Sequence, residues 1–171
     1  CGEMLSRSNV RRMLSLKTPI ALDTVTPAAK GHAGVIESAI GNLLKIARAL
    51  LATASLPIDM WPWAWDHSVW LHNVHAHEAC GGKSPYFMLH KKAPDLSRLR
   101  VFGSTCWTYI PHKHRRDGSK MNASGERRIF VGMPASGSGW MVMNPENRRV
   151  TRVYSCAWEE TIVGLHGHPL T

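Results

Sequence analysis

The chain has 171 residues, enough for one ordinary domain or for part of a domain joined to a second small one. It carries 21 Lys and Arg against 12 Asp and Glu, a formal net charge of +9, which favours a polyanionic partner. Its four separated cysteines suggest neither a disulfide framework nor a cysteine zinc knuckle. No signal peptide and no membrane-spanning apolar run is evident, so an intracellular location in the nucleus or cytoplasm is expected. The start at Cys1 instead of Met suggests a piece of a longer polypeptide.

Two helices are predicted in the first half of the chain. The first is amphipathic and ends near Ser55, because Pro57 cannot sit inside a helix. Its apolar stripe is formed by Ile36, Ile40, Leu43, Ala47 and Leu50. A second helix is expected over residues 58–74, with Pro62 in its first turn. The tryptophans of that segment imply a large buried surface.

The second half of the chain has the pattern of a small all-β module. Short runs rich in β-branched and aromatic residues are bounded by Gly, Pro and Asn, and they predict strands over residues 101–110, 128–133, 139–144 and 149–154. Residues 144–147 (NPEN) have the composition of a turn between two of these strands. Most of the excess positive charge lies in residues 91–128. The sequence therefore predicts an α+β chain with a basic central segment.

One face of the first helix is polar. Glu37, Gly41, Lys45 and Arg48 follow one another at steps of four, four and three residues, which places them on the side opposite the apolar stripe. From spacing alone, a solvated face is favoured, with Glu37 stabilised near a helix start by the helix dipole.

A series of motifs resembles the end of the integrase catalytic core in copia-type LTR retrotransposons, together with the segment that follows it. They occur in the family's order, and they are TP at 26–27, GVIE at 34–37, LP at 56–57, GKSPY at 82–86, KAPDLSRLRVFG at 92–103, YIP at 109–111, IFVG at 129–132 and NP at 144–145. The resemblance implies that residues 1–90 are the carboxy-terminal part of an RNase H-like core, truncated at its N-terminus. It also implies an SH3-like β-barrel with a basic loop over residues 91–162, and a tail over residues 163–171.

The resemblance assigns a role to Glu37. Integrase cores of this family use two aspartates and one glutamate to hold two divalent ions for DNA strand transfer, and Glu37 occupies the place of that glutamate as catalytic residue and metal ligand. Mg²⁺, or Mn²⁺, is thus implied for the intact parent enzyme. One carboxylate cannot hold two ions, and both aspartates would lie before Cys1, so this chain alone is expected to bind no ion tightly and to be inactive. Asp23 falls where the family has no ligand, and we assign it to a surface loop.

DNA is the expected partner, contacted mainly through its phosphates and without sequence specificity. The candidate contacts are the basic residues Lys45, Arg48, Lys113, Arg115, Arg116, Lys120, Arg127 and Arg128. The loop that holds Lys113 to Lys120 fits a solubilising hairpin equally well. Trp107, Tyr109 and Trp140 are expected to be core residues of the barrel and not base-stacking platforms. The rest of the Pol polyprotein is a second expected partner, no membrane is expected, and a homo-oligomer is left open.

The chain departs from the family pattern at two places. Residues 28–33 (AAKGHA) make the step before Gly34 about three residues longer than in the family, and Ser38 stands where the family commonly has Arg. Two other functions therefore stay open: a non-catalytic SH3-like module that binds a peptide or another polyprotein segment, and an inert pseudogene product. The crowded His67, His72, His75 and His77 lack a cysteine pair at zinc-finger spacing, so no structural zinc is expected.

Overall fold

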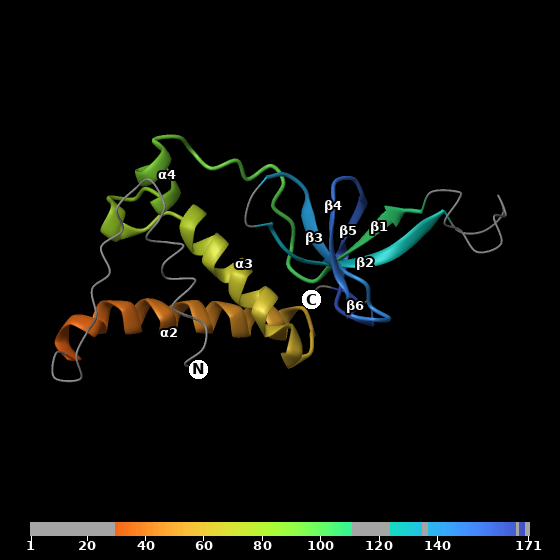
Figure 1. The fold of residues 1–171 in the computed structure, drawn as a ribbon, viewed down its shortest axis with the longest axis horizontal. Coiled ribbons are helices and arrows are strands. Elements are labelled where there is room, and N and C mark those ends of the chain that lie inside the picture. The colour runs from red at the N-terminus through yellow and green to blue at the C-terminus, as the bar shows by residue number, and fades with distance from the viewer. Residues whose placement is uncertain (1–29, 111–123, 135–136, 167, 170–171) are drawn as a thin grey trace, which may run out of the picture. The chain divides into compact units, whose positions relative to one another are not determined.

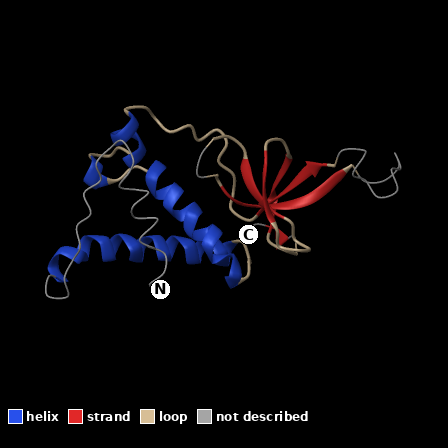
Figure 2. Cartoon of the chain, in the orientation of Figure 1, coloured by secondary structure: helices blue, strands red, loops and turns tan. Residues whose placement is uncertain are grey.

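The computed structural model describes residues 30–110, 124–134, 137–166 and 168–169. Its contacts divide the chain into two compact units, Cys1–Ala39 and Ile40–Thr171. The chain is helical first and then forms strands, as Figure 1 and Figure 2 show. The helices are α2 (Lys30–Thr53), α3 (Trp61–Val74) and α4 (Pro85–His90), with 3₁₀ turns at Ile58–Met60 and Glu78–Cys80. The predicted α+β class is confirmed.

Helix α2 confirms the first predicted helix, and it begins at Lys30. It ends ahead of Pro57 as predicted, and the next residues bend back so that the Leu56 amide donates to the carbonyl of Leu51 at 3.1 Å. Its apolar stripe is only partly covered: Ala47 is buried, whereas Ile40 keeps 44% of its surface exposed. The packing of α2 therefore comes mainly from its last two turns.

Helices α3 and α4 begin where local chemistry favours a helix start. Pro62 lies in the first turn of α3, as predicted, where its missing N–H costs no helical hydrogen bond. Helix α4 starts at Pro85, and the Ser84 hydroxyl caps it by accepting from the Phe87 amide at 3.2 Å. This short helix was not predicted, since the sequence shows only four apolar residues there.

Within the described residues, six antiparallel strands form one sheet in the order β4–β3–β2–β1–β5–β6. They are β1 (Ser104–Tyr109), β2 (Gly125–Gly132), β3 (Trp140–Met143), β4 (Val150–Val153), β5 (Ala157–Val163) and β6 (His168–Pro169). The first four confirm the four predicted strands. Strand β5 was missed because Glu159 and Glu160 interrupt its apolar pattern, although its side chains alternate between exposed and covered positions.

The register of the sheet places three buried residues side by side. Thr105 pairs with Ile129, and Ile129 pairs in turn with Met143. The register shifts between Phe130 and Gly132, an irregularity that bends a strand and increases its twist. Between β3 and β4, the Asn144 side-chain oxygen accepts from the Glu146 amide at 2.8 Å, which confirms the predicted turn.

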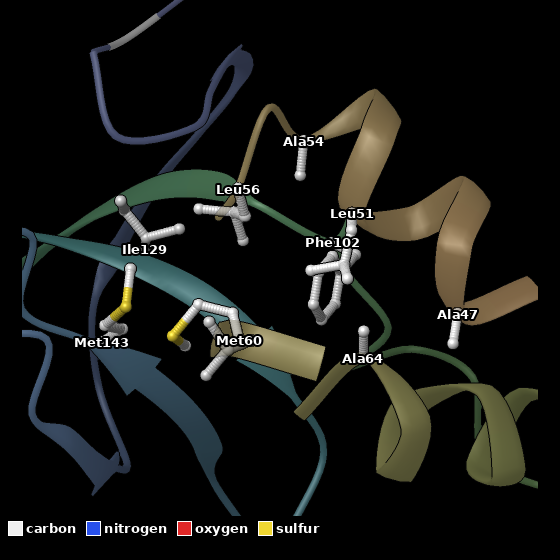
Figure 3. Packing of buried hydrophobic residues seen from close by; sticks show 10 residues of the cluster. Ala47, Leu51, Ala54, Leu56, Met60, Ala64, Phe102, Ile129 and Met143 are labelled. Carbon is white, nitrogen blue, oxygen red and sulfur yellow. The ribbon is translucent and has the colours of Figure 1, made fainter. Parts of the chain in front are cut away.

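The hydrophobic core joins the helices of the second unit to the sheet. Figure 3 shows side chains from α2, the Ile58–Met60 turn, α3 and the sheet pointing toward one another. The buried members of this cluster are Ala47, Leu51, Ala54, Leu56, Met60, Ala64, Phe102, Ile129, Val131 and Met143. A shared core of this kind makes the sheet and the helices depend on each other for burial. The family boundary predicted between residues 90 and 91 falls inside the second unit and stays a prediction.

Two contacts at the surface also connect the sheet to the segments that precede it. Asp59, in the Ile58–Met60 turn, forms an ion pair with Arg148, in the turn after β3. The indole N–H of Trp140 on β3 donates to the carbonyl of Arg98 at 2.7 Å. In the part of the chain that the structure describes, no helix is both long and apolar enough to cross a membrane.

Candidate nucleic-acid interface

Glu37 lies on α2, and its side chain is exposed. Because α2 begins at Lys30, Glu37 is its eighth residue, and the first turn contains no acidic residue. The helix dipole acts mainly within the first turn, so the alternative explanation of Glu37 as a helix-start acid is wrong. Gly41 follows at the next position on the same face, so no side chain there offers a partner charge.

The described residues do not fit a two-ion metal site. Such a site needs several oxygen ligands close together, and Glu37 is a single exposed carboxylate. Among the described residues, no group of three His, Cys, Asp or Glu side chains could hold a metal ion. Asp23 lies outside them. We therefore derive no catalytic step through a metal for this chain.

Lys45 and Arg48 lie three residues apart on α2, and both side chains are exposed. Neither has an ion pair or a side-chain hydrogen bond within the described ranges. Residues three apart share a face of a helix, so the two cations point the same way and are available to an external anion. Among the predicted DNA contacts that the structure describes, these two are exposed and have no internal partner, and their DNA role stays a prediction.

The basic loop lies between β1 and β2, and Lys113, Arg115, Arg116 and Lys120 are all outside the described residues. The strands that lead into it are paired as far as Tyr109 and Gly125. On β1, Trp107 is 46% exposed and Tyr109 is 68% exposed. The prediction that these two rings are core residues is therefore wrong. They share a face of β1 with the buried Thr105, which pairs with the core residue Ile129, but they lie farther along the strand, paired with Arg127 and Gly125, where the core no longer covers that face. Trp140 is partly buried, as its hydrogen bond to Arg98 requires.

Arg127 on β2 is held by the protein itself. Its guanidinium donates to the carbonyls of Gly164 at 2.7 Å and Leu165 at 2.8 Å, and to the hydroxyl of Thr105 at 3.1 Å. A planar guanidinium with several fixed donors suits such a bridge between chain segments. Arg127 thus ties the segment after β5 to β1 and β2, a structural role that the sequence did not reveal.

Arg128 is engaged in a smaller network. Its guanidinium pairs with one carboxylate oxygen of Glu126 at 2.7 Å, and the Asn144 amide donates to the other at 2.8 Å. Both Arg128 and Glu126 are partly covered, which strengthens a charge-assisted contact relative to one in open water. The DNA roles of Arg127 and Arg128 stay predictions, and any phosphate would compete with these internal partners.

Three histidines cluster at the end of α3. The ring centroids of His72 and His77 are 4.2 Å apart, and those of His75 and His77 are 5.5 Å apart. The pKa of His72 is lowered by burial and by the neighbouring His77 and His75. One nitrogen of His77 is hydrogen-bonded to the carbonyl of His72 at 2.7 Å, so this ring stabilises the turn after α3.

Residues 104–165, which include strands β1 to β5, match the family model of the retroviral polymerase SH3-like domain. The chain is also similar to the Retrovirus-related Pol polyprotein from transposon RE1 of Arabidopsis thaliana, with 24% identity over 127 residues, and to that from transposon RE2, with 26% identity over 129 residues. These alignments cover 74% and 75% of the chain. No solved structure matches the chain.

These similarities confirm the resemblance predicted from the sequence, that of a retrotransposon Pol polyprotein fragment with an SH3-like domain. The chain spans only 8% and 9% of the length of these two curated relatives.

Proposed function

We propose that this chain is the region of a copia-type Pol polyprotein in which the end of an RNase H-like integrase core passes into the SH3-like domain, and that it contacts DNA through phosphates. One observation carries the proposal. The similarity to Pol polyproteins extends over 127 residues, whereas the match to the SH3-like domain covers only residues 104–165. The likeness must therefore include much of the helical part that shares a core with the sheet.

The charge of the chain supports a DNA contact. A net charge of +9 favours association with a polyanion, and Lys45 and Arg48 are exposed cations on one helix face. Phosphate contacts of this kind position a protein on DNA without reading its sequence. The described surface thus suits a non-specific contact that assists a larger protein.

Catalysis is proposed only for a longer parent chain. There, Glu37 would supply one carboxylate of the ion-binding set, and Mg²⁺ or Mn²⁺ would bind when the two missing aspartates complete it. In this chain Glu37 is the single carboxylate of α2, and the described residues contain no group of three ligands that could hold a metal ion. We assign no strand-transfer activity to the chain itself, and we place its DNA contact in the nucleus or the cytoplasm.

The proposal is tested by measuring the affinity of the whole 171-residue chain for a duplex. Lys45 and Arg48 are replaced together by Ala, and in a matched control Lys92 and Arg149 are replaced by Ala. The control removes the same charge from two exposed residues. If the α2 face meets phosphates, the first pair lowers the slope of log affinity against log salt by about 1.8, since each phosphate contact contributes about 0.9. Equal effects of the two pairs would contradict a contact at α2 and leave only a general charge effect.

A second candidate function, a peptide-binding module without a role on DNA, is favoured by the apolar groove described below. An inert gene product remains the third. If the wild-type chain does not bind duplex DNA at low salt, the DNA role is excluded and these two other functions are supported.

A further inference from the structure

Two hollows lie between α3 and the sheet, with volumes of about 700 Å³ and about 550 Å³. Trp70, Asn73, Met133 and Pro134 line both of them. The two hollows are therefore adjacent and form one groove. It extends from Trp63, in the first hollow, to α4, which lines the second. We refer to it as the α3 groove. Each of the two hollows has the size of an ordinary ligand site.

Aromatic rings line the α3 groove along its length. Trp63, Trp65 and Trp70 come from α3, and Tyr86 comes from α4. All four rings are partly exposed. Behind Trp70 lies the ring of His67, stacked on it with the centroids 5.9 Å apart and the planes within 3°. His67 is only 2% exposed and holds Trp70 in place from the core side.

The α3 groove also presents unused hydrogen-bond donors. Among the residues that the structure describes, the indole N–H groups of Trp63, Trp65 and Trp70 have no protein acceptor, in contrast to the Trp140 indole. The exposed amide of Asn73, where the two hollows meet, has none either. The groove thus combines flat apolar surfaces with donors that point to no internal partner. Its natural complement is a ligand that is apolar and rich in acceptors.

We propose that the α3 groove binds an extended, proline-rich peptide segment. Proline has no N–H, so a run of prolines offers carbonyl acceptors without donors that the groove would have to satisfy. Such a segment forms a polyproline II helix in advance, and its rings pack in aromatic-lined grooves at a low entropic cost. The three indole N–H groups and the Asn73 amide supply the donors that the carbonyls need.

The charges in the α3 groove favour a peptide over a nucleic acid. Asp66 and Asp95 line it together with Arg98 and Arg152, so the ionic side chains balance. Hydrogen bonds from Ser97 hold the pKa of the Asp95 carboxyl below its usual range, and this group is ionised at neutral pH. A phosphate chain would pass both carboxylates and gain little from the groove. The proposal goes beyond the DNA contact and does not depend on it.

The test uses the 171-residue chain and three probes: decaproline, a glycine-serine peptide of the same length, and an oligothymidine of about ten nucleotides. Binding is followed by calorimetry and by tryptophan fluorescence. Decaproline is expected to bind at least about tenfold more tightly than the glycine-serine peptide. Replacing Trp65 by Leu is expected to weaken decaproline binding at least about tenfold, because a buried aromatic anchor carries much of the affinity of a site.

Trp107→Leu is the matched control, since Trp107 is an exposed ring on β1 outside the groove. It should leave the affinity for decaproline unchanged. Circular dichroism checks that each variant is folded, and Asn73→Ala replaces Trp65→Leu if the latter is not. The proposal is overturned by equal affinity for the two peptides, by an equal loss in the Trp107 variant, or by oligothymidine binding that is as tight and as sensitive to Trp65.

Discussion

A methyl group added at Gly103 would lie 2.3 Å from the Cβ atom of Ala54, so the chain entering β1 rests directly on the residue that follows α2. Ala54 is fully buried there. Gly164, which follows β5, lies at the same junction. Its amide donates to the carbonyl of Gly103 at 2.9 Å. Helix and sheet therefore meet through backbone contact, which leaves no space for a side chain.

Gly103→Ala should destabilise the whole second unit by about 2 to 4 kcal/mol. The substitution combines a left-handed backbone, with φ of +84°, and overpacking against Ala54. Because the core is shared, the helical and the aromatic signals should unfold together, at a lower temperature than in the wild type. Thermal unfolding followed by far- and near-ultraviolet circular dichroism measures both.

The matched control is Gly81→Ala. Gly81 also has a left-handed backbone, with φ of +62°, but nothing lies within 4 Å of an added methyl group. It should cost only the backbone term, about 1 to 2 kcal/mol. Equal costs for the two glycines, or a sheet that unfolds apart from the helices in Gly103→Ala, would contradict the shared core.

Arg127→Ala should lower the free energy of unfolding by about 2 to 3 kcal/mol, because it leaves two carbonyls and a hydroxyl without their charged donor. Arg149→Ala, at an exposed position, should stay within about 0.5 kcal/mol of the wild type. Chemical denaturation of the three proteins measures the difference. An unchanged stability with a weaker salt dependence of DNA binding would instead make Arg127 a phosphate contact.

Stability should fall as the pH is lowered from about 6.5 to about 4. Burial lowers the pKa of His67 to about 4, so the folded chain keeps this ring neutral while the unfolded chain protonates it near 6.5. Within this window the unfolded state binds more protons, and the full effect of His67 is about 3 kcal/mol. His67→Phe keeps a ring against Trp70 and should flatten the change between about pH 7 and 5. A profile as steep as that of the wild type would assign the effect to other groups.

Glu37→Gln should leave the thermal midpoint of this chain unchanged, because the side chain is exposed and lies beyond the first turn of α2. In a parent chain extended upstream to contain two aspartates, the same change should abolish metal-dependent joining of DNA ends. Gln keeps the size and the helix propensity of Glu but not the charge that holds Mg²⁺. A lower midpoint with full joining activity would remove Glu37 from the catalytic set.

The elements that the sequence predicted well are those with a regular apolar period. The stripe from Ile36 to Leu50 and the four β-branched runs have such a period, and each became a helix or a strand. Strand β5 could not be found this way, because its two glutamates lie at positions that the core does not bury and interrupt the apolar pattern. The exposure of Trp107 was missed for a related reason. Trp107 shares its face of β1 with the buried Thr105, and a local pattern does not show where along the strand the core stops covering that face.

In the candidate site, too, sequence reasoning placed the residues that local spacing determines and missed the contacts between distant segments. Spacing along α2 was enough to place Lys45 and Arg48 on one face, since helical period alone determines it. The bridge from Arg127 to Gly164 and Leu165 joins residues almost forty positions apart, and no local pattern signals such a contact. The same holds for the α3 groove, whose lining comes from α3, α4 and the sheet together.

The proposed DNA contact is tested most directly by the salt dependence of duplex binding by the whole chain. Affinity is measured between about 50 and 200 mM salt on two duplexes of unrelated sequence. A phosphate contact predicts a linear fall of log affinity with log salt, equal on both duplexes and shallower when Lys113, Arg115, Arg116 and Lys120 are replaced by Ala. An affinity that does not change with salt, or that differs strongly between the two sequences, would contradict the proposal.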